Sequence, residues 1–401
     1  MKYIILYHTS SKNSSTSLFY ARRKKQQILK TNPTVPFRVA FSLRIYSHKI
    51  TYISLLLFLL YFDIIVIMGS VRLYLKQYDS LHFLYRGFNM GEFGIALSNV
   101  SLTLAYVILG FCLCKGKKAV ANHLPTMSSV LIYLGSPFLV MSSFLKLEYS
   151  PQILGKMGLF FLAAMVLQGA FMALLYFILH KKMQDFRYRI CTMASVMGNA
   201  GFFGLPIVKA LLPDHPEVLC YACMYIVSMN LMAFTMGAYL VTGQRKYMTL
   251  KAAIINPTMI GLLISLPLFA FEVFPLIASH VPAAVTGIEA MASLTTPICM
   301  IILGIRLATV DLKLLFSRGM VYFACALKLL VFPLFVYAIS LLFPLDEAFR
   351  GALFILSGTP CASLVLNLTE IHETETGLAA NCVLVSTLLC VLTIPLLALL
   401  L

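Results

Sequence analysis

The sequence predicts an all-α polytopic membrane protein, with ten transmembrane helices arranged as two inverted five-helix repeats. Hydrophobic residues make up 60% of the 401 positions, charged residues make up 11%, and the mean hydropathy is +0.89. Soluble domains contain about 25% charged residues. In addition, successive apolar runs of about 20 residues are long enough to cross the ~30 Å of bilayer hydrocarbon. A third observation, an internal repeat, predicts how these helices are arranged.

Residues 1–89 form a basic N-terminal extension that has no counterpart in the repeat. Their 13 Lys and Arg residues stand against two acids, Asp63 and Asp79. This composition is typical of a disordered basic arm or a transit-like peptide. The apolar run 50–68 could be one extra transmembrane segment. The alternative, which we favour, is a mis-assigned start, with the protein proper beginning near Met90.

After Glu92 the apolar runs become regular, and they predict ten spans with the loops between them. The expected spans are 93–114, 125–145, 153–179, 187–211, 218–242, 252–273, 286–307, 319–343, 349–369 and 376–400. We therefore divide the chain into a first repeat at 90–242, a short cytoplasmic linker at 243–251 and a second repeat at 252–401.

Loop charge predicts the orientation of these spans. The loops after spans 1, 3, 5 and 7 carry 13 Lys and Arg residues, whereas the opposite side has four: Lys146, Lys156, Lys209 and Arg350. The basic side is expected to be cytoplasmic. We thus expect a multi-pass protein of the plasma or cytoplasmic (inner) membrane. The net charge of +16 gathers mainly in the extension and does not indicate nucleic-acid binding.

Corresponding residues recur about 160 positions apart. The pairs are Pro137 and Pro297, Lys146 and Arg306, Asp185 and Asp346, and Gly198 and Pro360. Each unit contains five spans, and an odd number of spans forces the second unit to be inverted relative to the first. Inverted repeats with discontinuous helices at the bilayer midplane are typical of secondary transporters.

The expected discontinuities lie in spans 4 and 9. Residues 198–206 read GNAGFFGLP and residues 357–363 read SGTPCAS, so both interrupt apolar runs with Gly and Pro. Broken helices persist in lipid only where they line a cavity or pack within protein. The alternative interpretation is close helix packing through small residues. The expected substrate-binding residues are Gly198, Asn199, Gly201, Pro360, Cys361 and Ser363. The expected helix-break or hinge residues are Pro137, Gly204, Pro206, Pro297 and Gly358.

The same stretches indicate the chemistry of the ligand. Half-helix N-termini favour anions, and the Asn199 amide can donate a hydrogen bond to a carboxylate. Lys328 is an intramembrane charge that should face the bundle interior. There it would balance substrate charge or bind a backbone carbonyl, unless it snorkels toward Arg318. We therefore expect a small organic anion as substrate. Asn230, Asn256 and Asn381, each taken alone, are interpreted as packing residues.

Several function classes lack sequence support. The sequence has no GxxxxGK[ST] motif for direct ATP use and no Ser/His, paired-Asp or HExxH constellation within the spans, so we do not expect an enzyme. Cys220 and Cys223 form the single CxxC pair, and neither a metal nor a cofactor is predicted. The main alternative is a non-transporting receptor or sensor, for which residues 1–89 would have to supply the output.

Residues 92–401 resemble the auxin efflux carrier family. The resemblance rests on GNAGFFGLP (198–206), Asn256-Pro257, TTPICMIILG (295–304), Lys328 five residues before Pro333, and SGTPCAS (357–363). It implies ten helices divided into a scaffold and a mobile transport domain, with helices 4 and 9 broken and crossing. It also implies carboxylate substrates such as malate, malonate or auxin-like acids. Apart from the resemblance, we expect transport by alternating access. The sequence does not show which ion drives it; H⁺ and Na⁺ are the candidates, and a homodimer is the candidate assembly. The short loop 243–251 is typical of prokaryote-type members, and Gly198 replaces a Pro that many plant members have.

Overall fold

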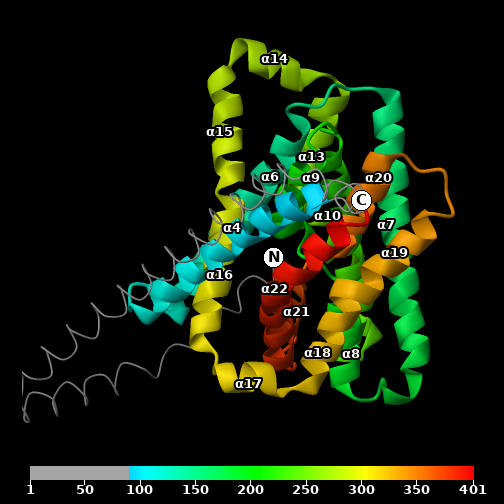
Figure 1. Ribbon diagram of the computed structural model, residues 1–401. Coiled ribbons are helices and arrows are strands. Elements are labelled where there is room, and N and C mark those ends of the chain that lie inside the picture. Colours follow the sequence, from blue (N-terminus) through cyan, green and yellow to red (C-terminus); the bar gives the residue numbers. More distant parts are fainter. Residues whose placement is uncertain (1–89) are drawn as a thin grey trace, which may run out of the picture. The chain divides into compact units, whose positions relative to one another are not determined.

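A computed structural model gives the fold of residues 90–401, without the side chains of residues 90 and 312–314. This part of the chain is all helical, and its single β-bridge joins Gly198 to Cys361. The all-helical prediction is therefore confirmed for the described range (Figure 1). The N-terminal extension, including the run 50–68, lies outside it.

Eight helical runs within residues 90–401 are long and apolar enough to cross a membrane. They are Gly91–Lys115, Ala121–Phe144, Pro151–Ile178, Val218–Thr242, Arg245–Ala270, Pro282–Thr309, Gly319–Ser340 and Thr376–Ala398. The first, third and last correspond to single helices: α4 (Met90–Lys115), α7 (Pro151–Ile178) and α22 (Thr376–Ala398).

The other five runs consist of consecutive helical segments. The segments are α5 (Leu124–Val130), η4 (Leu131–Gly135) and α6 (Ser136–Phe144); α10 (Val218–Met232), η7 (Ala233–Gly237) and α11 (Ala238–Thr242); α12 (Leu250–Ile254) and α13 (Pro257–Ala270); α15 (Pro282–Ser293) and α16 (Thr295–Thr309); and α18 (Gly319–Ala326), η9 (Leu327–Val331) and α19 (Phe332–Ser340). Two short helices, α14 (Val273–His280) and α17 (Leu312–Ser317), lie at opposite ends of the bundle (Figure 1).

The predicted spans 4 and 9 are each split into two short helices. Span 4 consists of α8 (Phe186–Ala194), followed by η6 (Ala200–Gly204) and α9 (Leu205–Leu211). Span 9 consists of α20 (Glu347–Ser357) and α21 (Ser363–Ile371). Each split occurs at the Gly- and Pro-containing stretch that the sequence singled out.

Side-chain caps start four of these helices. Asp185 accepts a hydrogen bond from the Arg187 N–H, and Asp346 accepts one from the Phe349 N–H. These two caps therefore begin α8 and α20, the first halves of the two split spans. Ser150 and Asn256 cap α7 and α13 in the same way, and each is followed by Pro, which suits the first helical position.

Glycines permit two close helix crossings. A Cβ added at Gly110 of α4 would overlap the Ile301 carbonyl oxygen of α16, and one at Gly304 would overlap the Val107 carbonyl oxygen. A Cβ at Gly261 of α13 would lie 2.7 Å from Pro137 Cα on α6. The backbones of α4 and α16, and of α13 and α6, thus touch directly, as small residues permit between membrane helices.

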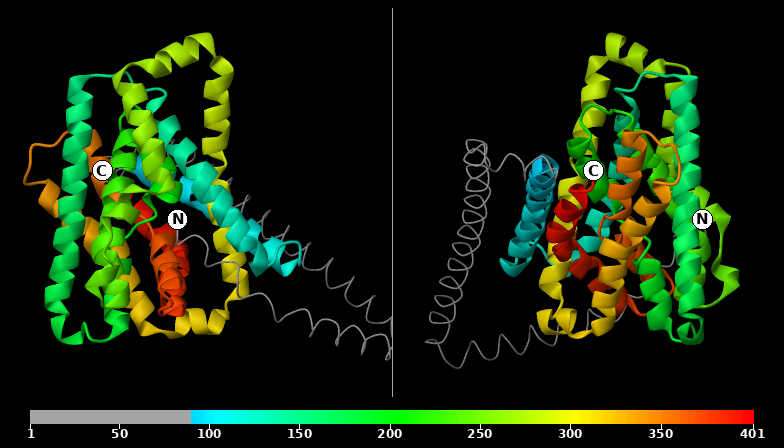
Figure 2. Two further views of the ribbon diagram at one scale, coloured as in Figure 1. Left: turned by 180° about the vertical axis from the view of Figure 1, so that it is seen from behind. Right: turned by 45° about the vertical axis from the view of Figure 1, so that its right-hand side comes forward.

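The remaining long helices pack around α10 and α22. Helix α10 lies against α7 and α20, and α22 lies against α18, α21 and α4 (Figures 1 and 2). Aromatic rings join the first group, since Phe160 stacks on Tyr221 with ring centroids 4.7 Å apart and Phe349 contacts both rings. These contacts hold the split helices between continuous ones.

A π-helical turn stands directly before a proline at three places. Turn η4 precedes Pro137, η6 precedes Pro206, and η9 precedes Pro333, each ending two residues before the ring. Proline clashes with the carbonyl one turn back in a regular α-helix, and a wider turn carries one extra residue. At Pro137 and Pro297, which were predicted as hinges, the chain stays helical on both sides.

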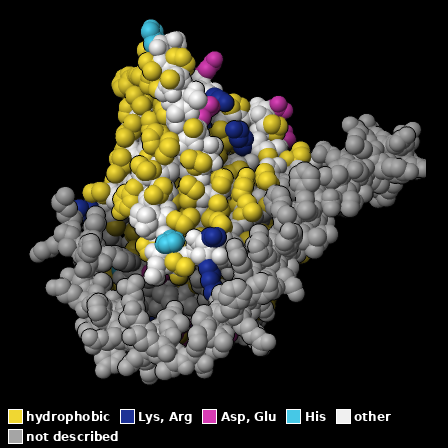
Figure 3. Space-filling view, turned by 90° about the vertical axis from the view of Figure 1, so that its left-hand side faces the viewer, with side chains coloured by type: hydrophobic (Ala, Val, Ile, Leu, Met, Phe, Trp, Pro, Cys, Tyr) yellow, Lys and Arg dark blue, Asp and Glu magenta, His cyan; other side chains and the backbone are white. Residues whose placement is uncertain are grey.

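Large apolar side chains on the described surface face outward. Phe177, Leu392 and Val166 are each more than 60% exposed, and Figure 3 shows hydrophobic side chains covering much of one face, with charged side chains grouped near its ends. Such exposure would be unfavourable in water, whereas it is expected in lipid. Residues 90–401 therefore form a multi-pass integral membrane unit.

Candidate functional site

The two helix breaks lie against each other. Gly198 in the first break and Cys361 in the second form an antiparallel bridge. The Asn199 N–H donates to the Pro360 carbonyl at 2.7 Å, and the Ala362 N–H donates to the Met197 carbonyl at 2.9 Å. Each break thus satisfies backbone groups that the other leaves exposed, which is how non-helical backbone is tolerated at membrane depth.

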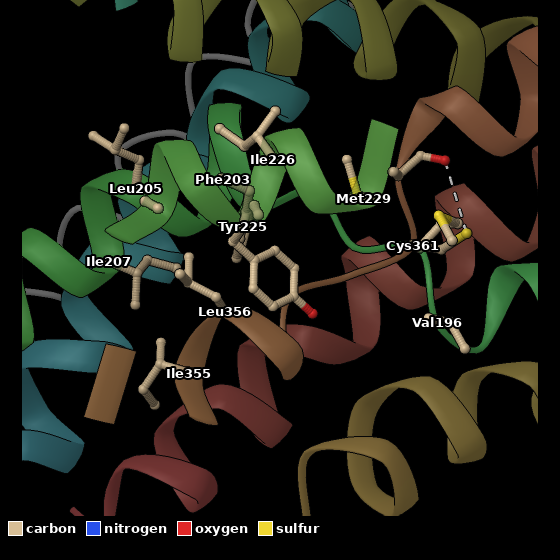
Figure 4. Close-up of a cluster of buried hydrophobic side chains, with 14 of the residues drawn as sticks. Val196, Phe203, Leu205, Ile207, Tyr225, Ile226, Met229, Ile355, Leu356 and Cys361 are labelled. Carbon is tan, nitrogen blue, oxygen red and sulfur yellow. Dashed lines mark hydrogen bonds between the residues drawn. The ribbon is translucent and has the colours of Figure 1, made fainter. Parts of the chain in front are cut away.

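Apolar side chains enclose this crossing. Figure 4 shows Val196 and Cys361 on the two crossing stretches, with Tyr225, Met229 and Leu356 on neighbouring helices. Val196, Cys361 and Tyr225 are almost completely buried. In these surroundings an unpaired backbone amide would cost several kcal/mol, so the bridge is a structural requirement of the crossing.

Lys328 binds a backbone carbonyl at the second break. Its side chain is 1% exposed, and Nζ donates to the Ser357 carbonyl at 2.6 Å. Nζ also lies over the Phe332 ring, 5.0 Å from its centroid. Within the described residues no carboxylate forms an ion pair with it. Lys328 therefore faces the bundle interior and binds a carbonyl, one of the two roles that the sequence suggested.

A cavity of about 350 Å³ adjoins the crossing. Gly198, Asn199 and Gly201 from the first break and Ser363 after the second line it. Pro360 and Cys361 are not among its lining residues, and they form the bridge instead. The structure thus brings together four of the six predicted binding residues at one cavity. The volume is within the range of small-molecule sites.

The predicted hinge residues occupy several positions around the crossing. Gly204 ends η6, and Pro206 follows it in α9. A Cβ at Gly204 would lie 2.8 Å from Thr359 Cγ2, so the glycine lets the two breaks approach. Gly358 follows the end of α20. Pro137 and Pro297 lie in the first turns of α6 and α16.

Most of the remaining cavity wall is apolar and comes from helices that do not break. Its apolar residues include Leu131, Leu139, Ile226, Met229, Ile302 and Leu303. They belong to η4, α6, α10 and α16. Sequence reasoning missed this part of the wall because apolar side chains give no signal of facing a cavity instead of lipid.

Four asparagines line the cavity, and they differ in how their amides are used. Asn256 caps α13 with Oδ1 and donates from Nδ2 to the Ala253 carbonyl, so it serves the backbone. Asn199 lies beside the Cys299 thiol. The side chains of Asn230 and Asn367 make no hydrogen bond within residues 90–401, and Asn230 is only 8% exposed. Asn230, which the sequence suggested as packing, therefore offers a free amide to the cavity.

The cysteines do not form a metal-binding group in this part of the chain. Within the described residues, no cluster of three or more His, Cys, Asp or Glu side chains could hold a metal ion. Cys220, half of the CxxC pair, donates to the Ser143 carbonyl at 3.3 Å. This contact joins α10 to α6 and indicates a packing role.

The fold and the site define a helical membrane protein with a ligand-sized cavity beside two crossed helix breaks. Comparison with known proteins agrees with this class: residues 242–398 match the family model described as membrane transport protein. An uncharacterized transporter of Methanocaldococcus jannaschii is 23% identical over 282 residues, which cover 69% of this chain and 89% of the relative.

A second relative is an uncharacterized transporter of Methanothermobacter thermautotrophicus. It is 28% identical over 214 residues, which cover 51% of this chain and 65% of the relative. The chain thus spans most of the first relative and just under two thirds of the second. Both similarities point to membrane transport.

Proposed function

We propose that this protein is a secondary transporter of small organic anions, of the auxin-efflux-carrier type, working by alternating access around the crossed breaks. The observation that carries the proposal is that both breaks meet at the wall of one cavity. Crossed half-helices beside a midplane cavity are a recurring substrate site in secondary transporters.

If each split span crosses the membrane once, these two and the eight long apolar runs of residues 90–401 would together make the ten crossings expected from the sequence. In this arrangement 90–242 and 252–401 are inverted repeats. Their matched caps, Asp185 and Asp346, begin α8 and α20 at opposite ends of the bundle, which supports the inversion. Residues 243–251 then form the cytoplasmic linker.

The glycine-mediated crossings support a division into two moving parts, which stay in contact where α4 packs on α22. Helices α4, α6, α13 and α16 make the glycine-mediated crossings and would form the scaffold. Helices α7, α10, α20, α21 and α22 hold the crossing and would form the transport domain. The cavity lies between these two sets, and relative motion of the sets would expose it to each side in turn.

In the proposed topology the cavity opens toward the cytoplasm. It is lined by Asn256 at the start of α13, Arg306 near the end of α16 and Ile371 at the end of α21. Loop charge assigns the first two helix ends to the cytoplasmic side, and the proposed ten-span topology puts the end of α21 on that side as well. We expect the protein in the plasma or cytoplasmic membrane, coupled to H⁺ or Na⁺ and assembled as a homodimer.

Flux into proteoliposomes tests the proposal. Purified protein would be reconstituted and supplied with labelled malate, malonate and benzoate, with and without imposed H⁺ and Na⁺ gradients. Saturable, gradient-stimulated uptake of at least one acid is the expected result. Binding of an acid without flux of any would contradict transport and favour a receptor.

A further inference from the structure

One charged side chain lines the cavity among the described residues: that of Arg306. It lies in the last turn of α16, and its side chain is 22% exposed. Its Nη1 donates to Glu370 Oε1 at 3.0 Å. Loop charge alone counts Arg306 as an orientation signal, whereas the structure places it in the cavity wall.

The carboxylate partner comes from the other side of the cavity. Glu370 lies on α21, one turn after Asn367, and it is not itself a lining residue. The pair therefore links α16 to the half-helix that follows the second break. Two other cross-helix pairs, Lys146–Glu289 and Lys156–Asp346, lie at the opposite end of the bundle.

This pair leaves the cavity without net charge while no ligand is bound. An organic anion entering an apolar cavity needs a countercharge, because a buried charge without a partner is strongly unfavourable. Arginine presents five N–H donors in a planar fork that matches a carboxylate. Glu370 accepts the hydrogen bond from Nη1. A ligand carboxylate that displaces Glu370 could accept hydrogen bonds from all the N–H groups of the Arg306 guanidinium.

The free amides of Asn230 and Asn367 are an independent sign of a polar ligand here. Both line the cavity, and neither side chain has a hydrogen-bond partner within residues 90–401. Asn230 is more than nine-tenths buried as a residue, yet its amide atoms are not fully enclosed, so the amide is open to the cavity that it lines. A ligand with polar atoms would satisfy these amides.

We propose that Arg306 is the residue that recognises charge in this cavity, and that Glu370 is an internal counter-ion that the carboxylate of the substrate displaces. The inference rests on the proposed transport function. It specifies the substrate class as an organic acid with a carboxylate at Arg306 and an apolar body against Ile226, Met229 and Leu303. Displacement also releases α21 from α16, so binding would loosen a direct contact between these two helices.

Equilibrium binding of benzoate to purified protein tests this assignment, with neutral benzamide as the isosteric probe. Arg306→Gln should weaken benzoate binding by roughly 10- to 100-fold, since a hydrogen bond to a charged group contributes about 1.5–3 kcal/mol. Glu370→Gln should strengthen it several-fold, because the internal competitor is neutralised. Arg306→Lys should be intermediate, and benzamide binding should change little in all three.

The ion pair Arg318–Glu375 supplies the matched control. It lies on the same side of the membrane, at 3.9 Å, and neither residue lines the cavity. Arg318→Gln and Glu375→Gln should leave benzoate affinity unchanged. Thermal unfolding of each variant in detergent separates loss of affinity from loss of fold.

Weaker benzoate binding by Arg306→Gln together with stronger binding by Glu370→Gln would support displacement of Glu370 by the substrate carboxylate. Equal weakening of binding by both, or no effect of either in a protein that still transports acids, would overturn it and leave the proposed function intact. Failure of the wild type to bind or move any carboxylate would overturn the proposed function itself.

Discussion

The two helix breaks occupy corresponding positions in the predicted repeat, yet they face different surroundings. The first break presents Gly198 and Asn199 to the cavity. The second is fixed by side chains of two other helices. Lys328 donates a hydrogen bond to the Ser357 carbonyl, and the Ser386 hydroxyl accepts one from the Cys361 N–H at 2.9 Å. The first break therefore lines the cavity, whereas the second break is fixed in place by side chains of other helices.

The largest effect should come from filling the contact between the breaks. A Cβ at Gly198 would overlap Thr359 Oγ1 and lie 2.8 Å from Lys328 Nζ. Gly198→Val should therefore push the breaks apart, lower thermal stability by about 1–3 kcal/mol and abolish uptake into proteoliposomes. Gly158→Ala in α7 is the control, since nothing lies within 4 Å of the added Cβ. Normal uptake by Gly198→Val would mean that the breaks need not touch.

Asn199 tests whether the first break meets the ligand. Asn199→Ala should weaken substrate affinity by tenfold to somewhat over a hundredfold, if its amide donates to a carboxylate, with little change in thermal stability. Pro360→Ala restores an N–H in the second break and should slow transport more than it weakens binding. Lower stability with intact affinity in Asn199→Ala would instead assign the amide to packing.

Ser386 tests whether the second break is anchored. Ser386→Ala leaves the buried Cys361 N–H without its acceptor, which should cost about 1–3 kcal/mol of stability. Thr387→Val is the neighbouring control, because the Thr387 hydroxyl bonds only to the Val383 carbonyl of its own helix. Thermal unfolding in detergent should show a clear drop for the first variant alone. Equal drops would indicate loss of α22 packing instead.

The sequence predicted the breaks because Gly, Pro and Asn inside an apolar run cannot be explained by an ordinary membrane helix. It could not predict that Asn230 and Arg306 line the cavity. Asn230 lies in a regular helix, and which side that helix turns to the cavity depends on its neighbours α7 and α20. Asn256, which we interpreted as a packing residue, instead caps α13, and an Asn before Pro at a helix start is a common N-cap arrangement.

The smallest effects should come from the two matched caps. Burial opposes ionisation of Asp346, but hydrogen bonds from Lys156 and the Phe349 N–H prevail and keep the pKa of its carboxyl below the ordinary value. Hydrogen bonds from the Arg187 side chain and N–H similarly lower the pKa of Asp185. Each cap should contribute stability that is present above about pH 4 and is lost as the pH falls through the lowered pKa.

Replacing either cap by Ala should cost about 0.5–2 kcal/mol. Asp346→Ala should cost more, because Asp346 also ties α20 to Lys156 of α7 at 2.6 Å, whereas Asp185 pairs with Arg187 two residues away. Thermal unfolding at pH 7 would measure the cost of each substitution, and at pH 2, below the lowered pKa values of both carboxyl groups, each cost should shrink. A larger loss of stability for Asp185→Ala than for Asp346→Ala would contradict this prediction.

The bridge between Gly198 and Cys361 also constrains how the protein is made. Its two strands are more than 160 residues apart, so the Asn199 N–H and the Met197 carbonyl have no partner in the second break until span 9 has been synthesised. If the fourth span entered the bilayer during that interval, its exposed backbone groups would have no partner in lipid. We therefore expect that synthesis of the second half completes the membrane insertion of the first.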